Sequence, residues 1–323
     1  MLMNSLKNWM TGIGLAAGLL TTGRAYALSS DLSTLLPWDS NINVESSTWG
    51  LLENKSHIRN DGTPAQIGIV DSSGRVRLAD TGQYSPTIAW DSLYMALNTH
   101  SSLLPRQLNE QSMSLGIPIV QSGPWSLGAV VGAGYSGNSP YNEGQAVYGL
   151  ADITAQYQFN PRDSLVFGIN YDGNRSVLPD VPLPTVEFLH ETTKLTWGVG
   201  IYEYLDYRPF DRLNLELMYF PTDDGHADID YRLLRWLHVY GLFASQSWAF
   251  HVDYYNHDQR LFFNMCRVEA GVRIITCPNF SMKLGGGYAF NQAFSQGYQS
   301  INETPVGQIA NAAYISLNAK FKF

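Results

Sequence analysis

One pair of residues has the types and spacing for nucleophilic chemistry. His100 and Ser102 form the single His-x-Ser sequence of the chain, His100-Ser101-Ser102. In an extended strand, residues two positions apart project to the same side, as a serine nucleophile and its histidine base require. Such a pair could attack the ester carbonyl of a lipid and release an acyl chain.

The surroundings of this pair argue against catalysis. The residue twelve positions after Ser102 is Ser114, where a polar third member of the site would be needed, and Pro105 indicates that the segment is a serine-rich loop. A three-residue match also arises often by chance. We therefore expect no enzyme, and His100 and Ser102 are only weak catalytic candidates for a lipid-acting hydrolase.

Other polar groupings do not form a recognisable site. His251-x-Asp253 and Asn256-His257-Asp258 contain metal-ligand types, but their spacing fits no closed tetrahedral set. The sequence contains no phosphate-binding loop and no dinucleotide glycine motif. We expect no metal and no cofactor.

Composition narrows the class of protein. The net charge of -8 argues against nucleic acid as a partner. After the first 27 residues no apolar run is long enough for a transmembrane helix, which excludes a helical membrane bundle. Aromatic residues make up 13%, with 19 tyrosines, and this enrichment is typical of the aromatic girdles of membrane β-barrels.

The last fourteen residues carry the clearest pattern of structure. Apolar side chains occupy every second position up to the terminal Phe323, namely Ala313, Ile315, Leu317, Ala319, Phe321 and Phe323. Polar side chains occupy the positions between them, so one face of this strand suits lipid and the other a polar lumen. The sequence therefore predicts an all-β protein, a transmembrane up-and-down antiparallel β-barrel.

Similar segments recur from residue 87 onwards, separated alternately by short proline-marked turns and longer polar loops. The pattern predicts about twelve strands, with ten or fourteen as alternatives: 87–98, 111–121, 125–136, 146–159, 164–173, 193–207, 212–220, 226–233, 236–254, 260–275, 279–290 and 310–323. Counting back from Phe323 places the proline turns at the periplasmic end and the long loops outside.

Alternation also predicts which charged side chains face the lumen: Asp152, Glu216, Asp228, Asp230, Arg232, His238, Arg267, Glu269, Arg273 and Lys283. Because both signs occur, two interpretations are open. Acids and bases could pair across the lumen and close it, since buried charges are tolerated when partnered. They could instead line a narrow water path and determine its selectivity.

The first 86 residues differ from the rest. Residues 1–27 read as a cleaved signal peptide, with a short apolar core from Ile13 to Leu20 and the small-x-small site Ala25-Tyr26-Ala27. Residues 28–86 do not continue the barrel pattern, and we expect a periplasmic segment or a plug of the lumen. The predicted barrel domain is 87–323.

Several features resemble known outer-membrane proteins. The closing Lys320-Phe321-Lys322-Phe323 resembles the last strand of bacterial outer-membrane barrels, where the terminal aromatic residue is part of the signal for the barrel-assembly machinery. Together with Leu115-Gly116-Ile117-Pro118, Trp125-Ser126-Leu127-Gly128 and Gly285-Gly286-Gly287-Tyr288-Ala289-Phe290, it resembles uncharacterised Gram-negative barrel families of unknown function, as in planctomycetes.

The resemblance implies a bacterial outer-membrane location, with outer-membrane lipid, lipopolysaccharide and the assembly machinery as partners. It supplies no catalytic or binding residue. We expect a narrow, porin-like channel or passive transporter for small solutes, the solute being unknown. The alternative is a closed structural or surface-interaction barrel that acts through its extracellular loops.

Overall fold

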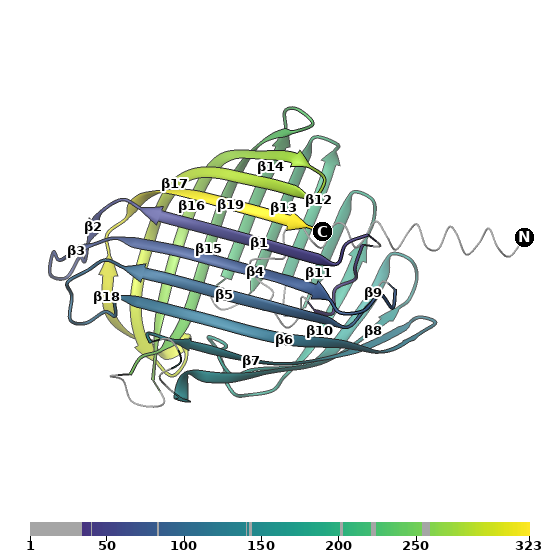
Figure 1. Ribbon diagram of the computed structural model, residues 1–323, viewed down its shortest axis with the longest axis horizontal. Coiled ribbons are helices and arrows are strands. Elements are labelled where there is room, and N and C mark those ends of the chain that lie inside the picture. Colours follow the sequence, from purple (N-terminus) through teal and green to yellow (C-terminus); the bar gives the residue numbers. More distant parts are fainter. Residues whose placement is uncertain are drawn as a thin grey trace, which may run out of the picture.

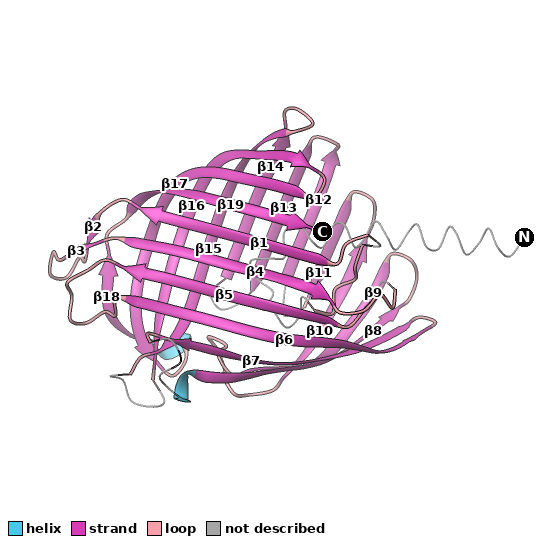
Figure 2. Cartoon of the chain, viewed as in Figure 1, coloured by secondary structure: helices cyan, strands magenta, loops and turns pink. Residues whose placement is uncertain are grey.

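The structure is a computed structural model that describes residues 34–39, 41–82, 84–139, 141, 144–200, 203–220, 224–253 and 259–323. The predicted signal peptide and the stretch 256–258 lie outside these residues. Most of the described chain is β-strand (Figure 2). Among the described residues, no helix is long and apolar enough to cross a membrane.

Sixteen strands in the described part of the chain form the wall of one closed barrel (Figure 1). They are β1 (Val44–Glu53), β4 (Ile67–Arg77), β5 (Thr87–Leu97), β6 (Gln107–Ser122), β7 (Trp125–Gly137), β8 (Val147–Gln158), β9 (Asp163–Asp172), β10 (Leu183–Glu191), β11 (Leu195–Val199), β12 (Glu203–Phe210), β13 (Leu213–Phe220), β14 (Asp224–Arg232), β15 (Leu237–His251), β16 (Arg260–Cys277), β17 (Phe280–Gly297) and β19 (Ala312–Lys322).

Each wall strand pairs antiparallel with the next, and β1 closes the ring by pairing with both β19 and β4. Closure leaves no unpaired strand edge. Both ends of the wall meet where the N–H of Val44 donates to the carbonyl of Phe323 at 2.9 Å. We call this the terminal end of the barrel and the opposite end the distal end.

Short elements decorate the distal end. β2 (Ser56–His57) and β3 (Pro64–Ala65) form a small hairpin between β1 and β4. β18 (Thr304–Ile309) pairs with the distal part of β17. Two 3₁₀ turns, η2 (Gly144–Ala146) and η3 (Ser300–Asn302), lie in distal loops.

The predicted count of about twelve strands, with ten or fourteen as alternatives, is wrong. Two of the four additional strands are β1 and β4, so the wall begins at Val44 rather than at residue 87. Their alternation is inverted: Trp49, Leu51 and Ile69 point inward and are buried, whereas Ser46 and Gly50 lie on the outer face. A pattern that expects apolar side chains outside misses such strands.

The other two additional strands come from the middle of the chain. β10 lies within the stretch 173–193 that the sequence suggested as one long loop. The predicted strand 193–207 is instead the hairpin of β11 and β12. The three residues between them preserve the alternation, so the pattern runs through the turn without a break.

The outer face is apolar and the inner face polar over most of the wall. In β19 the outward Ile315 is 65% exposed and Leu317 is also exposed, whereas the inward Tyr314, Ser316 and Asn318 are buried. The predicted faces of this last strand are therefore confirmed. Outward Ile153, Ile169, Leu217 and Ile229 continue the apolar surface around the barrel.

Opposite walls meet at the distal end. Gly137 of β7 and His251 of β15 form a parallel bridge, and the Ser136 hydroxyl donates to the Ala249 carbonyl at 2.7 Å. This contact divides the mouth between two arcs of seven strands, β8 to β14 on one side and β16, β17, β19, β1, β4, β5 and β6 on the other.

The distal part of the second arc is filled with apolar side chains. The buried cluster contains Trp49 and Leu51 of β1, Ile67 and Ile69 of β4, Met95 of β5, Leu108 of β6, Phe263 of β16 and Phe294 of β17. The rings of Phe263 and Phe294 stack with their centroids 4.6 Å apart. We call this cluster of the distal lumen the dry core; the polar side chains of Glu53 and Gln292 are buried in the same arc.

Candidate functional site

A row of carboxylates crosses the inner wall. Asp206 of β12 lies opposite Glu216 of β13, and Glu216 lies opposite Asp228 of β14. Like charges in directly opposed positions repel one another. The row therefore requires positive charge from elsewhere in the barrel.

The compensating bases come mainly from β16, β17 and β19, which follow β15 along the wall. Lys283 Nζ of β17 lies 2.8 Å from Asp228 Oδ2, and Arg273 Nη1 of β16 lies 3.0 Å from Asp230 Oδ2. Lys320 of β19 lies close enough to Glu216 to interact electrostatically. We call these acids and bases, together with Asp206 and its neighbour Arg208, the charge belt.

A histidine extends the belt within the wall. His238 Nδ1 of β15 lies 2.6 Å from Asp230 Oδ1, and His238 is also the register partner of Arg232. Asp230 therefore contacts both His238 and Arg273. This geometry holds a carboxylate in a buried position with charged or polar groups on two sides, as a buried charge requires.

A second network lies on β16 beside the belt. Arg267 Nη1 lies 3.1 Å from Glu269 Oε2, and the phenols of Tyr240 and Tyr314 donate to the same carboxylate at 2.6 and 3.0 Å. The Arg267 guanidinium also lies 4.4 Å from the ring centre of Trp49. Arg267 and Glu269 are both buried, so this network joins the belt to the dry core.

The ten charged residues predicted from alternation thus fall into three groups. Glu216, Asp228, Asp230, Arg232, His238, Arg273 and Lys283 lie in or beside the belt, and Arg267 and Glu269 form the second network. Asp152 lies apart on β8, where the Asn170 amide donates to it at 2.8 Å.

Sequence reasoning missed other interior charges. Asp71 and Arg75 lie on β4, which was not recognised as part of the wall. Asp206 lies on β12, whose hairpin was read as one strand. The alternation of the predicted strand 193–207 already places Asp206 inward, whereas Asp71 and Arg75 could be placed only once β4 was recognised as a wall strand.

A pocket lined by both polar and apolar side chains lies on the inner wall of the first arc. Its lining residues are Asp152, Thr154, Val166, Asn170, Arg175, Leu183, Thr185, Val186, Glu187 and Phe220. Most come from β8, β9 and β10, and Phe220 is the last residue of β13. The pocket therefore belongs to the half of the barrel that the dry core does not fill.

The loop 173–182 between β9 and β10 reaches from this arc to the other one. Arg260, at the start of β16, is 2% exposed and donates to the carbonyls of Asn174 and Arg175 at 3.1 and 2.9 Å. The Asn174 amide in turn donates to Glu110 Oε1 of β6 at 2.8 Å. Leu178 and Asp180 have positive φ, an uncommon conformation for residues other than glycine. The loop is held across the distal mouth.

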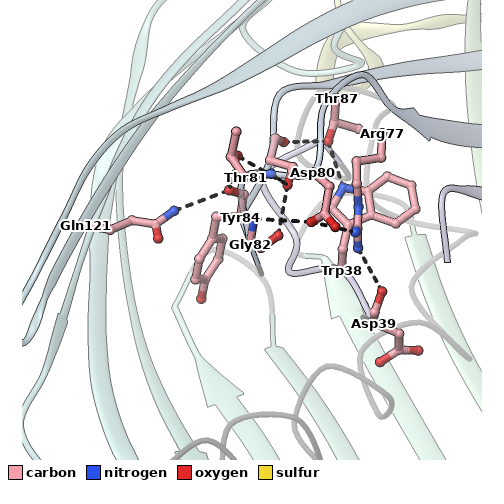
Figure 3. Close-up of polar contacts among 10 residues, drawn as sticks. Trp38, Asp39, Arg77, Asp80, Thr81, Gly82, Tyr84, Thr87 and Gln121 are labelled. Atoms are coloured by element: carbon pink, nitrogen blue, oxygen red, sulfur yellow. Dashed lines mark hydrogen bonds and ion pairs between the residues drawn. The ribbon is translucent and has the colours of Figure 1, made fainter. Parts of the chain in front are cut away.

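A short segment at the terminal end lines the interior (Figure 3). Residues 34–39, which we call the strap, run along the inner face of β4 to β7. The Trp38 indole lies 4.1 Å from the Arg75 guanidinium and donates to Thr87 Oγ1 at 2.8 Å. Arg75 and Arg77 donate to the strap carbonyls of Leu36, Pro37 and Asp39.

The strap changes the predicted division of the chain. Residues 28–86 were expected to be a separate periplasmic segment or plug, but most of them form β1, β4 and their connections. Among the described residues of this segment, the strap is the part that lies inside the wall. The strap packs against an inward glycine of β6, because a Cβ on Gly116 would lie 2.4 Å from Thr34 Cβ.

The weak catalytic candidates lie far from this interior. His100 and Ser102 are exposed residues of the loop between β5 and β6. The shared strand face that would align a nucleophile and its base is absent there, because β5 ends at Leu97. Within the described residues, no group of three or more metal-ligand side chains could hold a metal ion.

A closed antiparallel barrel with an apolar exterior and a charged interior defines a transmembrane β-barrel of the outer-membrane type. Similar solved structures include a mutant of the monoaromatic hydrocarbon channel TodX, with 10% identity, a TM-score of 0.42 and coverage of 94% of this chain and 95% of that one. No family model and no curated protein sequence matches the chain.

Two further structures have comparable likeness. A FadL homologue from Pseudomonas aeruginosa has 11% identity and a TM-score of 0.40, covering 91% of this chain and 96% of its own. Omp33 of Acinetobacter baumannii has 11% identity and a TM-score of 0.36, covering 87% and 99%. All three are bacterial outer-membrane barrels. The resemblance to barrel families of unknown function stays a prediction.

Proposed function

We propose that the chain is an outer-membrane channel that conducts small polar solutes passively through one half of its barrel. The observation that carries the proposal is the division of the lumen. The arc of β8 to β14 has polar and charged side chains inside and contains the pocket, whereas the dry core occupies the distal part of the other arc. A path that crosses the membrane therefore runs along the first arc.

The charge belt supports a selective path. Acids of β12, β13 and β14 face bases of β16, β17 and β19 across the interior. A transverse arrangement of charges orients a dipolar solute and restricts passage by charge. The chemistry needs no catalytic group and no cofactor.

The location belongs to the same proposal. The terminal end would face the periplasm and the distal loops the outside, with the outer belt of Ile153, Ile169, Leu217, Ile229 and Ile315 against lipid. The aromatic ending at Phe323 would be read by the barrel-assembly machinery. Lipopolysaccharide would surround the distal end.

A second candidate function rests on a different observation, the narrowing of the distal mouth. The bridge of Gly137 with His251 and the loop held by Arg260 narrow the distal mouth. A barrel closed in this way would act through its distal loops as a structural or surface-interaction protein.

Single-channel recording separates the two. Residues 28–323 would be refolded and inserted in a planar bilayer, beside a variant that lacks residues 28–39. The deletion spares every wall strand, because the first of them, β1, begins at Val44. Steady openings of either protein support the channel. Silence of both, in protein shown to be folded by its β-sheet circular dichroism, would favour the closed barrel.

A further inference from the structure

Basic side chains are grouped on one side of the terminal end. Of the turns that connect the described wall strands at this end, the four that follow β8, β10, β12 and β14 each contain one exposed base, namely Arg162, Lys194, Arg212 and Arg235. The remaining connections, 78–86, 123–124 and 278–279, contain no lysine or arginine. We call the four turns that follow β8, β10, β12 and β14 the basic rim.

The charge of the rim is not neutralised by the barrel itself. None of its four bases forms an ion pair with another described residue, whereas Lys322 at the end of β19 lies 3.3 Å from Glu45. Two acids lie on the same rim. Asp211 is exposed, and Asp163 Oδ1 lies 2.6 Å from His190 Nδ1. With four bases against two acids, the rim has a positive formal charge.

An aromatic girdle on the outer face places the rim at the boundary between hydrocarbon and water. Trp125 of β7 and Tyr157 of β8 are register partners with ring centres 4.7 Å apart, and Phe159 lies 5.1 Å from Tyr157. On β10 and β11, the ring centres of Phe188 and Trp197 lie 5.5 Å apart. Aromatic side chains of membrane barrels concentrate at this boundary. Because the rim lies just beyond the girdle, its bases lie at the level of the lipid headgroups.

Three of the four turns also combine their base with exposed apolar side chains. Phe159 is 54% exposed three residues before Arg162, and Phe210 is 52% exposed two residues before Arg212. The turn 233–236 exposes three apolar side chains around its arginine, those of Leu233, Leu234 and Trp236. Basic and apolar side chains that alternate in this way suit a lipid surface of negative charge.

We propose that the basic rim binds the phosphodiester headgroups of anionic phospholipid in the leaflet at the terminal end. In the orientation proposed above, this is the periplasmic leaflet. Each base attracts a headgroup phosphate through charge and hydrogen bonding, while the neighbouring apolar side chains contact the acyl chains. A zwitterionic headgroup is attracted less, because its own positive group opposes the attraction.

The inference concerns the lipid around the barrel, so it stands whether or not the barrel conducts. Because the rim follows the strands of the first arc, anionic lipid would gather on the side of the barrel that contains the pocket.

The test measures which lipids associate with the barrel. Refolded residues 28–323 are reconstituted in phosphatidylcholine bilayers that contain a trace of spin-labelled phosphatidylglycerol or, separately, of spin-labelled phosphatidylcholine. Electron paramagnetic resonance measures the motionally restricted fraction of each label. We expect phosphatidylglycerol to associate about fivefold more strongly at low salt, the effect of about one basic side chain per lipid. This preference should shrink at about 1 M NaCl, where charges are screened over about 3 Å.

Removal of the positive charge is expected to abolish the preference. The quadruple variant combines Arg162→Gln, Lys194→Gln, Arg212→Gln and Arg235→Gln, and circular dichroism establishes that it is folded. If it does not fold, the pair Arg212→Gln with Arg235→Gln replaces it and should reduce the preference.

Two controls separate the charge of the rim from other effects. The triple variant Arg162→Lys, Arg212→Lys and Arg235→Lys keeps every charge and should keep the preference. The pair Lys55→Gln with Arg106→Gln removes two exposed bases from distal loops and should leave the preference unchanged.

Three results would overturn the proposal. The first is equal association of the two labels with the folded wild-type chain, and the second is a preference that persists in the folded quadruple variant. The third is a preference that falls as much in the distal pair as in the pair Arg212→Gln with Arg235→Gln, because the lipid would then not be bound at the rim. Loss of the preference in the triple lysine variant would overturn recognition by charge.

Discussion

Lys283 Nζ and Asp228 Oδ2 lie 2.8 Å apart although their strands, β17 and β14, are separated in the wall by β15 and β16. The contact therefore crosses the concave interior rather than following a pair of neighbouring strands. The Lys283 ammonium also lies 4.6 Å from the ring centre of Tyr240, on the intervening β15. Both charged side chains are largely buried.

We expect removal of either partner of this pair to destabilise the barrel. Lys283→Met leaves Asp228 without that partner, and Asp228→Asn does the same to Lys283; loss of one member of a buried pair costs about 3–5 kcal/mol. Urea unfolding in detergent measures the change. A double variant that costs less than the sum of the single variants would establish the coupling, and Lys194→Met in an exposed terminal turn is the control.

Arg260 is expected to hold the loop 173–182 in place. Arg260→Ala removes its hydrogen bonds to the carbonyls of Asn174 and Arg175, so the loop should open more often. Trypsin cleavage after Arg175 should then become about 10-fold faster, because a loss of 1.4 kcal/mol raises the open population tenfold. Arg235→Ala, in an exposed turn at the terminal end, provides the comparison. Equal cleavage rates would contradict the role of Arg260.

The strap is expected to depend on the glycine beneath it. In Gly116→Ala the added Cβ would lie 2.4 Å from Thr34 Cβ and 3.1 Å from the Thr34 carbonyl carbon, so the strap must shift. Amide hydrogen exchange of residues 34–39 should accelerate, while exchange in β5 and β8 stays slow. Gly149→Ala is the matched control, because its Cβ would meet Tyr171 at an ordinary 3.5 Å. Unchanged exchange of the strap in Gly116→Ala would refute this packing.

The dry core is expected to contribute much of the distal stability. Phe294 is fully buried and stacks on Phe263, so Phe294→Ala should destabilise the fold by about 3–5 kcal/mol. Leu103→Ala removes an apolar side chain that is mostly exposed in a distal loop and should change stability little. Unfolding in urea compares the two. A small effect of Phe294→Ala would mean that this half of the lumen is not packed as a core.

Alternation by itself determined the class of fold, the faces of the last strand and the side of the barrel on which each proline turn lies. It could do so because outward side chains meet lipid and inward ones do not, and this difference repeats every second residue. The end of the barrel at which each proline turn lies was predicted correctly although four strands were missed, because two of these strands precede the predicted barrel and two lie within it. An even number of missed strands leaves the direction of the strands beyond them unchanged.

Only the tertiary structure decided which side chains contact one another inside the lumen. Alternation placed Asp228 and Lys283 inside, but their contact depends on how the closed wall curves, which no local pattern encodes. Inward Trp49, Leu51 and Ile69 concealed β1 and β4, because they are buried against Phe263 and Phe294 rather than exposed to water. The contact of Gly137 with His251, two residues more than a hundred positions apart, separates the arc that holds the dry core from the arc that holds the pocket.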